Sequence, residues 1–328
     1  GHTATSLTAR QTIDVNAMRI SIFGLGYVGA VCAGCLSARG HEVIGVDVSS
    51  TKIDLINQGK SPIVEPGLEA LLQQGRQTGR LSGTTDFKKA VLDSDVSFIC
   101  VGTPSKKNGD LDLGYIETVC REIGFAIREK SERHTVVVRS TVLPGTVNNV
   151  VIPLIEDCSG KKAGVDFGVG TNPEFLREST AIKDYDFPPM TVIGELDKQT
   201  GDLLEEIYRE LDAPIIRKTV EVAEMIKYTC NVWHAAKVTF GNAIGDIAKA
   251  VGGDGREVMD VICQDHKLNL SRYYMRPGFA FGGSCLPKDV RALTYRASQL
   301  DVEHPMLGSL MRSNSNQVQK AFDLITSH

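Results

Sequence analysis

The chain has 328 residues, of which 42% are hydrophobic, and a formal net charge of -4. A chain of this length buries a large core and divides into more than one domain, and its charge offers no basic surface for nucleic acid. No apolar run approaches the ~20 residues that cross a membrane. The eight cysteines are scattered, mostly inside apolar segments, which indicates a reducing cytoplasm rather than a disulfide framework.

Residues 1–17 show neither the apolar core of a signal peptide nor any periodicity. We interpret them as a leader or disordered arm, with Met18 as the natural start. The first predicted domain therefore begins at residue 18.

A glycine turn follows the first predicted strand, Ile20–Phe23. The turn is Gly24-Leu25-Gly26-Tyr27-Val28-Gly29, and an apolar helical run begins within it. In this context Gly24 makes a tight turn, Gly26 lets a pyrophosphate approach the backbone, and Gly29 lets helix and sheet pack closely. The N–H groups at the helix N-terminus favour an anion. We therefore predict a dinucleotide site that includes Tyr27 and Val28; the alternative is that the glycines are only structural.

The second predicted strand, Glu42–Val46, ends at Asp47. A carboxylate at this place accepts hydrogen bonds from the adenosine ribose and repels a 2′-phosphate, so it favours NAD over NADP. Lys52 lies further along the chain and would soften that preference. NAD is therefore the predicted cofactor.

Strands alternate with helices as far as about residue 217. The further predicted strands are Val96–Val101, Thr135–Val138, Val165–Val169 and Met190–Gly194. This alternation predicts an α/β fold, with a doubly wound, mostly parallel, Rossmann-like sheet over residues 18–216. Ligands of such sheets bind beyond the carboxyl ends of the strands, where Thr103, Thr141 and Glu174 lie. Each alone could be a cap or turn residue, but three polar turns at one sheet edge indicate a site.

A long helical pattern without proline, Val220–Val251, opens an all-helical domain over residues 217–328. Polar and apolar residues spaced by three or four positions form one stripe on it: Lys227, Asn231, His234, Val238 and Asn242. Trp233 and Phe240 are among the apolar residues that we expect to be buried around this stripe. The stripe indicates a site or an interface, with a satisfied core network as the alternative. The length of the apolar helix predicts a homodimer or higher oligomer.

A second helical stretch, Gly255–Gln264, leads to the aromatic and arginine loop Arg272–Phe279. Arginine and tyrosine together suit a phosphorylated, hydroxyl-rich ligand, and a surface loop with stray aromatics is the alternative.

The most informative motif is Gly282-Gly283-Ser284-Cys285, because it places one thiol in a glycine-flanked turn beside Lys288. A nearby cation favours the thiolate, which can attack a carbonyl group. Pro287-Lys288-Asp289 is then expected to cap a last pair of helices. Cys32 and Cys35 have C-x-x-C spacing but fall inside the first predicted helix, so no metal site is predicted.

Taken together, these residues resemble the UDP-glucose/GDP-mannose dehydrogenase family, the nucleotide-sugar 6-dehydrogenases. The matching motifs are Gly24-x-Gly26-x-x-Gly29, Val101-Gly102-Thr103-Pro104, Ser140-Thr141-Val142-x-Pro144-Gly145-Thr146, Asn172-Pro173-Glu174-Phe175-Leu176, Lys227-x-x-x-Asn231 and Phe281-Gly282-Gly283-Ser284-Cys285-Leu286-Pro287-Lys288-Asp289. The loop Arg272–Phe279 resembles that of members that oxidise GDP-mannose in bacterial alginate synthesis. The resemblance thus implies GDP-mannose as substrate, with UDP-glucose as the alternative.

The resemblance implies a four-electron oxidation of a sugar C6 alcohol to a carboxylate with NAD. Cys285 would hold the aldehyde as a thiohemiacetal and then as a thioester. Lys227 and Asn231 would stabilise oxyanions, and Asp289 would be the base for the alcohol. Glu174 would activate the hydrolytic water, with Thr141 orienting it. The resemblance further implies sugar-nucleotide contacts from Glu178, Lys227, Asn231, His234, Asn242, Tyr273, Tyr274, Arg276 and Phe279, and cofactor contacts from Thr103, Thr141 and Lys288.

The family also has a third domain that completes the sugar-nucleotide site, and the sequence has no counterpart to it. We therefore expect this chain to be a fragment, for which NAD binding without turnover is an alternative function. A simpler β-hydroxyacid dehydrogenase is a further alternative, since it shares the cofactor domain and a helical lysine but does not need Cys285.

Overall fold

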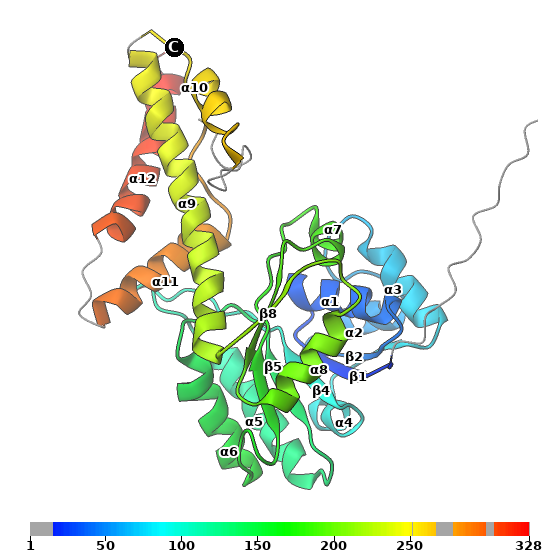
Figure 1. Cartoon of the computed structure of the whole chain (residues 1–328). Helices are drawn as coiled ribbons and strands as arrows, with labels where there is room; N and C mark the ends of the chain where they lie inside the picture. Colours follow the sequence, from blue (N-terminus) through cyan, green and yellow to red (C-terminus); the bar gives the residue numbers. More distant parts are fainter. Residues whose placement is uncertain (1–15, 251, 267–277, 300–304, 328) are drawn as a thin grey trace, which may run out of the picture.

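The structure, a computed structural model, describes residues 16–250, 252–266, 278–299 and 305–327. A sheet with its covering helices occupies the chain up to about residue 218, and helices alone follow (Figure 1). This order confirms the prediction of an α/β region followed by an all-helical region. Among the described residues, none of the helices has the length and hydropathy that a membrane span requires.

Eight strands form a single sheet. They are β1 (Arg19–Phe23), β2 (Glu42–Val46), β3 (Leu81–Thr84), β4 (Val96–Ile99), β5 (Thr135–Val138), β6 (Gly168–Thr171), β7 (Thr191–Glu195) and β8 (Ile215–Lys218). Their spatial order is β3-β2-β1-β4-β5-β6-β7-β8. All neighbours from β3 to β6 are parallel, β7 runs antiparallel to β6, and β8 is parallel to β7. The carboxyl ends of β1, β4, β5 and β6 therefore meet at one edge.

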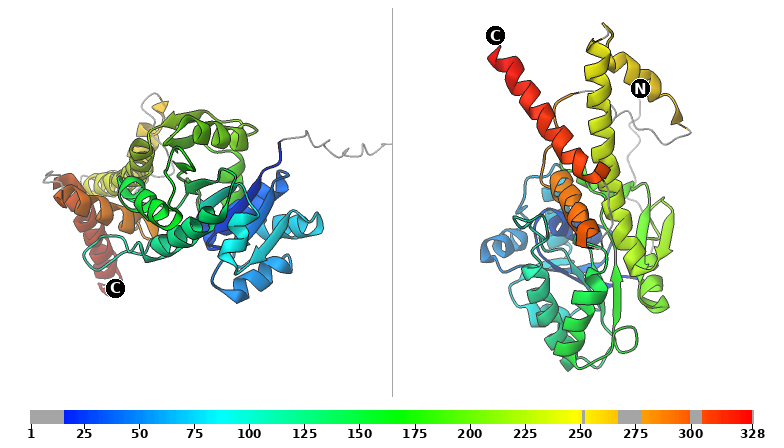
Figure 2. Two further views of the ribbon diagram at one scale, coloured as in Figure 1. Left: turned by 90° about the horizontal axis from the view of Figure 1, so that it is seen from below. Right: turned by 90° about the vertical axis from the view of Figure 1, so that its left-hand side faces the viewer.

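Helices cover both faces of this sheet (Figure 2). They are α1 (Tyr27–Ala38), α2 (Ser50–Asn57), α3 (Leu68–Gln77), α4 (Phe87–Leu92), α5 (Gly114–Glu129), the π-helix η1 (Val147–Val151), α6 (Ile152–Ser159), α7 (Ala181–Asp186) and α8 (Lys198–Tyr208). Successive residues of a strand point to opposite faces, so Phe98 packs into the core beside α1 and α8, while Ile99 packs into the core beside α5 and α6.

The sequence-based strand predictions were wrong at three places. The predicted strand Val165–Val169 starts too early and ends too early, because Val165 is 65% exposed in a turn and β6 runs from Gly168 to Thr171. Strands β3 and β8 were not predicted. Both lie at the ends of the sheet, pair on one side only and are partly exposed, so their sequences lack the apolar run of a central strand.

The glycine turn brings α1 very close to β1. A Cβ built on Gly29 would lie 1.7 Å from the Gly24 carbonyl oxygen, which no side chain tolerates. A Cβ built on Gly26, by contrast, would meet no described atom within 4 Å. The two glycines thus serve different purposes, packing at Gly29 and open space at Gly26.

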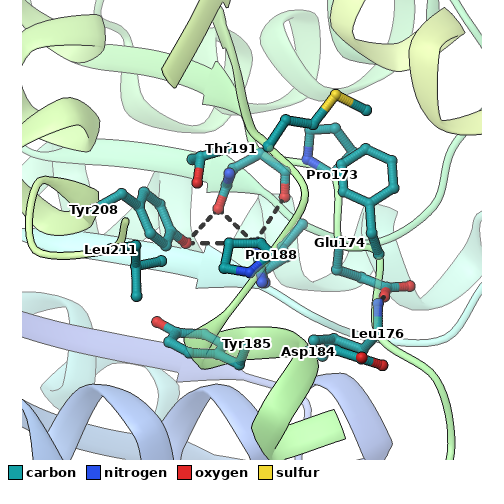
Figure 3. A pocket seen from close by; sticks show the side chains of 13 residues that line it. Pro173, Glu174, Leu176, Asp184, Tyr185, Pro188, Thr191, Tyr208 and Leu211 are labelled. Atoms are coloured by element: carbon teal, nitrogen blue, oxygen red, sulfur yellow. Dashed lines mark hydrogen bonds between the residues drawn. The ribbon is translucent and has the colours of Figure 1, made fainter. Parts of the chain in front are cut away.

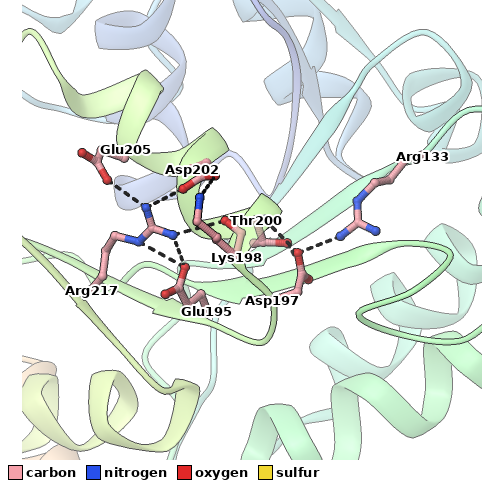
Figure 4. Close-up of polar contacts among 8 residues, drawn as sticks. All are labelled: Arg133, Glu195, Asp197, Lys198, Thr200, Asp202, Glu205 and Arg217. Atoms are coloured by element: carbon pink, nitrogen blue, oxygen red, sulfur yellow. Dashed lines mark hydrogen bonds and ion pairs between the residues drawn. The ribbon is translucent and has the colours of Figure 1, made fainter.

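Strand β8 is tied to α8 by a charged cluster around Arg217 (Figure 4). The Arg217 guanidinium contacts Glu195 at 2.5 Å, Asp202 at 2.7 Å and Glu205 at 2.9 Å. Nearby, Arg133 pairs with Asp197 at 2.8 Å. These side chains are partly exposed, so the cluster fixes the end of the sheet without forming a buried site.

The helical region consists of α9 (Val220–Ala250), α10 (Gly255–Ile262), α11 (Cys285–Gln299) and α12 (Pro305–Thr326). The first turn of α9 lies against β7, where a Cβ on Gly194 would come within 2.7 Å of the Ala223 Cβ. From there α9 runs away from the sheet, with α11 and α12 packed along it (Figure 1).

Two predictions for the helical region were wrong. Trp233 and Phe240 of α9 are 49% and 51% exposed in the single chain rather than buried. Cys285 does not lie in a turn ahead of the last helices, because α11 begins at this residue. Pro287, Lys288 and Asp289 therefore belong to the first turns of α11, a position that suits proline because the first helical N–H groups need no partner within the helix.

We predict that Gly29→Ala destabilises the protein by about 3 kcal/mol, because the added methyl group would collide with backbone atoms of Gly24 that have little freedom to move. Gly26→Ala, at an open position, is the matched control and should change the free energy of unfolding by less than about 1 kcal/mol. Denaturant unfolding of both variants tests this pair. Equal stability of the two variants would contradict the packing role of Gly29.

Candidate active site

The N-terminus of α1 is open at Gly26. Among the described residues no side chain caps this end, and the first turn contains no acidic residue. Tyr27 and Val28 are half-buried beside it. Because unpaired N–H groups and the helix dipole attract anions, this end has the space and the charge for a pyrophosphate, and so the residues present fit a dinucleotide.

Asp47 fastens the glycine turn to the end of β2. Its Oδ2 accepts a hydrogen bond from the Leu25 N–H at 2.8 Å, and its Oδ1 accepts one from the Ser49 N–H at 2.9 Å. Each carboxylate oxygen can accept a second hydrogen bond, so Asp47 can still accept hydrogen bonds from the ribose hydroxyls. Lys52 lies in the first turn of α2, where its backbone N–H donates to Ser49 Oγ at 3.3 Å.

Thr103 and Thr141 meet where two neighbouring parallel strands end. Thr103 follows β4 and Thr141 follows β5, and the Thr103 hydroxyl donates to the Thr141 carbonyl at 2.8 Å. Thr103 is buried and Thr141 is partly exposed. The structure therefore joins these two predicted residues at the carboxyl edge of the sheet.

Glu174, just after β6, faces helix α9. Its Oε2 accepts a hydrogen bond from the Leu176 N–H at 2.7 Å, and its Oε1 lies 3.5 Å from Lys227 Nζ. Lys227 Nζ also lies 5.4 Å from the centre of the Phe175 ring. Glu174 and Lys227 are 8% and 7% exposed, so this ion pair is largely removed from water and its two charges depend on each other.

Asp289 joins α11 to the polar stripe of α9. Asn231 Nδ2 donates a hydrogen bond to Asp289 Oδ2, and Lys288 Nζ lies 3.7 Å from Asp289 Oδ1. Burial raises the pKa of Asp289, while Lys288 and the Asn231 hydrogen bond act in the opposite direction. A carboxylate with a raised pKa is a stronger base, which suits the predicted proton acceptor.

Cys285 is the exposed thiol of this region. It is the first residue of α11, and its Sγ lies 3.6 Å from the Ser284 hydroxyl. Cys285 and Asp289 are four residues apart on one helix, so they lie on the same side. The contact between Asp289 and Asn231 joins this side of α11 to the stripe of α9.

Asn242 holds the segment that leads to Cys285. Its Oδ1 accepts a hydrogen bond from the Gly278 N–H at 2.5 Å, and its Nδ2 donates to the Phe279 carbonyl at 3.3 Å. Asn314 of α12 does the same for Phe281, with its Oδ1 and Nδ2 each 2.8 Å from the backbone. The Asn242 side chain thus holds the backbone of Gly278 and Phe279, in addition to the predicted contact with the substrate.

The remaining predicted substrate residues are more dispersed. Burial lowers the pKa of His234 to about 4, with Lys237 and Lys227 adding to the effect, so its imidazole is neutral at pH 7. Glu178 is exposed in the loop after Glu174, and Phe279 is 66% exposed. Tyr273, Tyr274 and Arg276 lie outside the described residues.

Arg139, a buried cation beside the loop that carries Glu174, was not predicted from the sequence as a site residue. Its Nη1 donates to Asn172 Oδ1 at 2.6 Å and to the Tyr208 hydroxyl at 3.3 Å, and its Nε donates to Cys32 Sγ at 3.0 Å. A hydrogen bond with Cys100 lowers the pKa of Cys32 to about 7, with help from Arg139 and against the effect of burial. The available signal was a charged residue directly after an apolar strand.

A small pocket of about 30 Å³ lies beside Arg139 and the loop that carries Glu174 (Figure 3). Tyr185, Thr191 and Tyr208 line it together with Glu174. Because Arg139 and Tyr208 both bond to Asn172, this cluster fixes the start of the loop that carries Glu174.

Glu224, also missed, joins α9 to the loop that follows Thr141. Its two carboxylate oxygens accept hydrogen bonds from the Gly145 N–H at 3.2 Å and the Val147 N–H at 3.3 Å. It is 2% exposed, and burial raises its pKa to about 7, with the bonds to Val147 and Gly145 opposing this rise. Glu224 lies one turn before Lys227 and so sets the position of the stripe.

Known protein families and proteins are similar to this chain over most of its length. A model of the NAD-binding domain of the UDP-glucose/GDP-mannose dehydrogenase family matches residues 18–212, and a model of the central domain of that family matches residues 221–316. The chain is 99% identical over 311 residues to GDP-mannose 6-dehydrogenase of Pseudomonas aeruginosa, which covers 95% of this chain and 71% of the relative. It is 36% identical over 314 residues to a UDP-glucose 6-dehydrogenase of Haloferax volcanii, covering 94% of this chain and 72% of the relative.

Solved structures give the same grouping. A ternary complex of GDP-mannose dehydrogenase from P. aeruginosa is similar with a TM-score of 0.77 at 99% identity, covering 95% of this chain and 71% of that one. A UDP-glucose dehydrogenase from Pyrobaculum islandicum is similar with a TM-score of 0.90 at 37% identity, covering 97% and 72%.

The match to an NAD-binding dehydrogenase domain, together with the open N-terminus of α1 at the carboxyl edge of the sheet, defines an NAD-dependent oxidoreductase. The chain belongs to the UDP-glucose/GDP-mannose dehydrogenase family. The predicted family and the predicted cofactor are thereby confirmed.

We predict that Glu224 makes the protein less stable as the pH rises. The folded-state pKa of about 7 lies above the ordinary glutamate pKa of 4.5, so between these pH values the folded state keeps a proton that the unfolded state has lost. Stability therefore falls from about pH 4.5 to pH 7 and levels off above pH 7.

Glu224→Gln removes this titration. The free energy of unfolding of the variant, taken relative to that of the wild type, should be up to about 3 kcal/mol higher at pH 8 than at pH 4.5, whatever the absolute stability of the variant. Denaturant unfolding at the two pH values measures the change. Asp166→Asn, at an exposed turn, is the control and should show no such gain. A Glu224→Gln curve parallel to the wild type would contradict the raised pKa.

Proposed function

We propose that this chain carries out the NAD-dependent oxidation of the C6 hydroxymethyl group of GDP-mannose to a carboxylate, giving GDP-mannuronate. The observation that carries this proposal is the place of Cys285, one helical turn before Asp289, whose carboxylate contacts the stripe of α9. The near identity to a GDP-mannose 6-dehydrogenase supports this substrate, and UDP-glucose is the alternative.

Cys285 would serve as the covalent nucleophile. Its thiolate attacks the C6 aldehyde, a C–S bond forms, and protonation of the oxygen gives a thiohemiacetal. Loss of that proton and of the C6 hydride gives a thioester, and water then breaks the C–S bond to release the carboxylate and the thiol. The full reaction consumes one water and transfers two hydrides, so two NAD molecules are reduced for each sugar.

Lys227 and Asn231 would stabilise the oxyanion at C6, because both present N–H donors from the same side of α9. Asp289 would take the proton of the alcohol, which its buried position and raised pKa support. Glu174 would activate the hydrolytic water, with Thr141 orienting it. The ion pair between Glu174 and Lys227 supports this arrangement, since it places the proposed water-activating carboxylate 3.5 Å from the proposed oxyanion-stabilising ammonium group.

Residues at both ends of the site would hold the two ligands. The backbone from Gly24 to Gly29 would hold the NAD pyrophosphate, Asp47 the ribose with Lys52 nearby, and Thr103, Thr141 and Lys288 would lie near the cofactor. NAD, when bound, supplies the hydride acceptor. The sugar nucleotide would be contacted by Glu178, His234, Asn242, Tyr273, Tyr274, Arg276 and Phe279.

We further propose that the chain forms a homodimer through the outer side of α9. Trp233 and Phe240 are seven residues apart, so they share one side of the helix, and both are about half exposed in the single chain. Sedimentation of a monomer at micromolar concentration would count against the dimer.

A cytoplasmic location is also proposed, because all eight cysteines are free thiols.

The first experiment is NADH formation with GDP-mannose and, separately, with UDP-glucose, with the product identified. Two NADH per GDP-mannose would support the proposed function. Turnover of UDP-glucose instead would change the substrate, and saturable NAD binding without any turnover would leave the chain as a cofactor-binding fragment.

Cys285→Ser should lower the rate of carboxylate formation by roughly 10³-fold or more, because no thioester can form. NAD binding should remain normal. The control is Cys158→Ser, which alters a buried cysteine of α6 and should keep activity. Product analysis after a fixed time checks this. Normal amounts of carboxylate from Cys285→Ser would rule out the covalent scheme.

Asp47→Asn should weaken NAD binding about tenfold, because the amide replaces one of the two acceptor oxygens that would face the ribose. Isothermal titration with NAD measures the affinity. Lys52→Ala should leave NAD affinity nearly unchanged. Equal NAD affinity of Asp47→Asn and wild type would show that the carboxylate does not contact the cofactor.

A further inference from the structure

Ser179 has an unusual backbone conformation. Its φ is +74°, and it is the only non-glycine residue with a positive φ in the described part of the chain. Ser179 is the third residue of the turn Arg177–Thr180, which the Thr180 N–H closes by donating to the Arg177 carbonyl at 3.2 Å. A φ near +80° at this position is that of a type II turn, where glycine is preferred. Such strain persists only where surrounding structure imposes it.

Glu65, far from the turn in sequence, imposes it. Its Oε2 accepts a hydrogen bond from the Ser179 N–H and its Oε1 accepts one from the Ala181 N–H, both at 3.0 Å. The Glu65 side chain is only 8% exposed, so both bonds are largely shielded from water. Gly67, two residues after Glu65, lies near α7, since a Cβ built on it would be 4.0 Å from Ile182 Cγ1.

The peptide between Glu178 and Ser179 decides the type of turn. Rotating it by about 180° converts a type II into a type I turn, in which the third residue has a φ near −90° that serine adopts freely. The Glu178 carbonyl, rather than the Ser179 N–H, would then face the Glu65 carboxylate. Two oxygens would repel each other there, so Glu65 disfavours the relaxed turn.

We propose that Glu65 is a positioning residue that selects this turn and thereby sets the direction of the Glu178 side chain. Both peptide planes beside the Glu178 Cα are held, the preceding one by the bond from Thr180 to Arg177 and the following one by Glu65. The start of the turn is fixed as well, because the Arg177 N–H donates to Asp184 at 2.9 Å. The effect on the sugar nucleotide rests on the proposed function, in which Glu178 contacts it.

Glu65→Gln tests the proposal on the whole chain. The amide keeps one acceptor oxygen and gains an N–H donor that can bind the Glu178 carbonyl of the flipped turn. We expect the amides of Ser179 and Ala181 to lose protection from hydrogen exchange, measured by mass spectrometry. We also expect the Kd for GDP-mannose, measured by calorimetry, to rise about tenfold. The matched control is Glu69→Gln, since Glu69 bonds Ser61 instead and both readouts should stay unchanged.

A second substitution distinguishes this mechanism from general damage. Glycine adopts a positive φ without strain, so Ser179→Gly added to Glu65→Gln should recover much of the lost GDP-mannose affinity. Ser179→Ala added to Glu65→Gln should recover none, because alanine is strained in the same way as serine.

Normal exchange protection and normal affinity in Glu65→Gln would overturn the proposal, as would equal recovery with glycine and alanine. Reduced protection with unchanged affinity would overturn the link to Glu178. Failure of the wild-type chain to bind GDP-mannose would instead contradict the proposed function, and the exchange data would still decide whether Glu65 holds the turn.

Discussion

Helix α9 is one continuous hydrogen-bonded helix, and four segments of the candidate site are attached to one side of it. A helix keeps its side chains at a fixed spacing, so partners that are distant in sequence become fixed relative to one another. The attachments, in order along α9, are Glu224 to the loop at Gly145, Lys227 to Glu174, Asn231 to Asp289, and Asn242 to Gly278. Helix α9 thus fixes the positions of the carboxyl edge of the sheet and of helix α11 relative to one another.

The sequence was sufficient to predict those parts of the fold that depend on local pattern. The glycine turn, strands β1, β2 and β5 and the long helix α9 follow from apolar runs, glycines and helical spacing, and they lie where predicted. The stripe on α9 was predictable for the same reason, because a period of three and four residues places side chains on one side. The family resemblance supplied the chemical roles, which remain proposals.

The features that could not be predicted depend on contacts between distant segments. Nothing near Glu65 in the sequence indicates a bond to Ser179, and Arg139 is recognisable as a buried cation only once Asn172 and Tyr208 surround it. The exposure of Trp233 shows a different limit. An apolar residue on a long helix can face the core or a partner surface, and the pattern is the same for both.

The close approach of α9 to β7 has a mechanical consequence. The helix rests on the sheet at Gly194, and from Ala223 to Asn242 it extends about 28 Å as a rigid arm. A tilt of about 5° at that pivot would move the far end by about 2.5 Å, which is more than a hydrogen bond tolerates. Small displacements at Gly194 are therefore amplified with distance, and the segment before Cys285, held at the far end, is more sensitive to this pivot than Lys227 is.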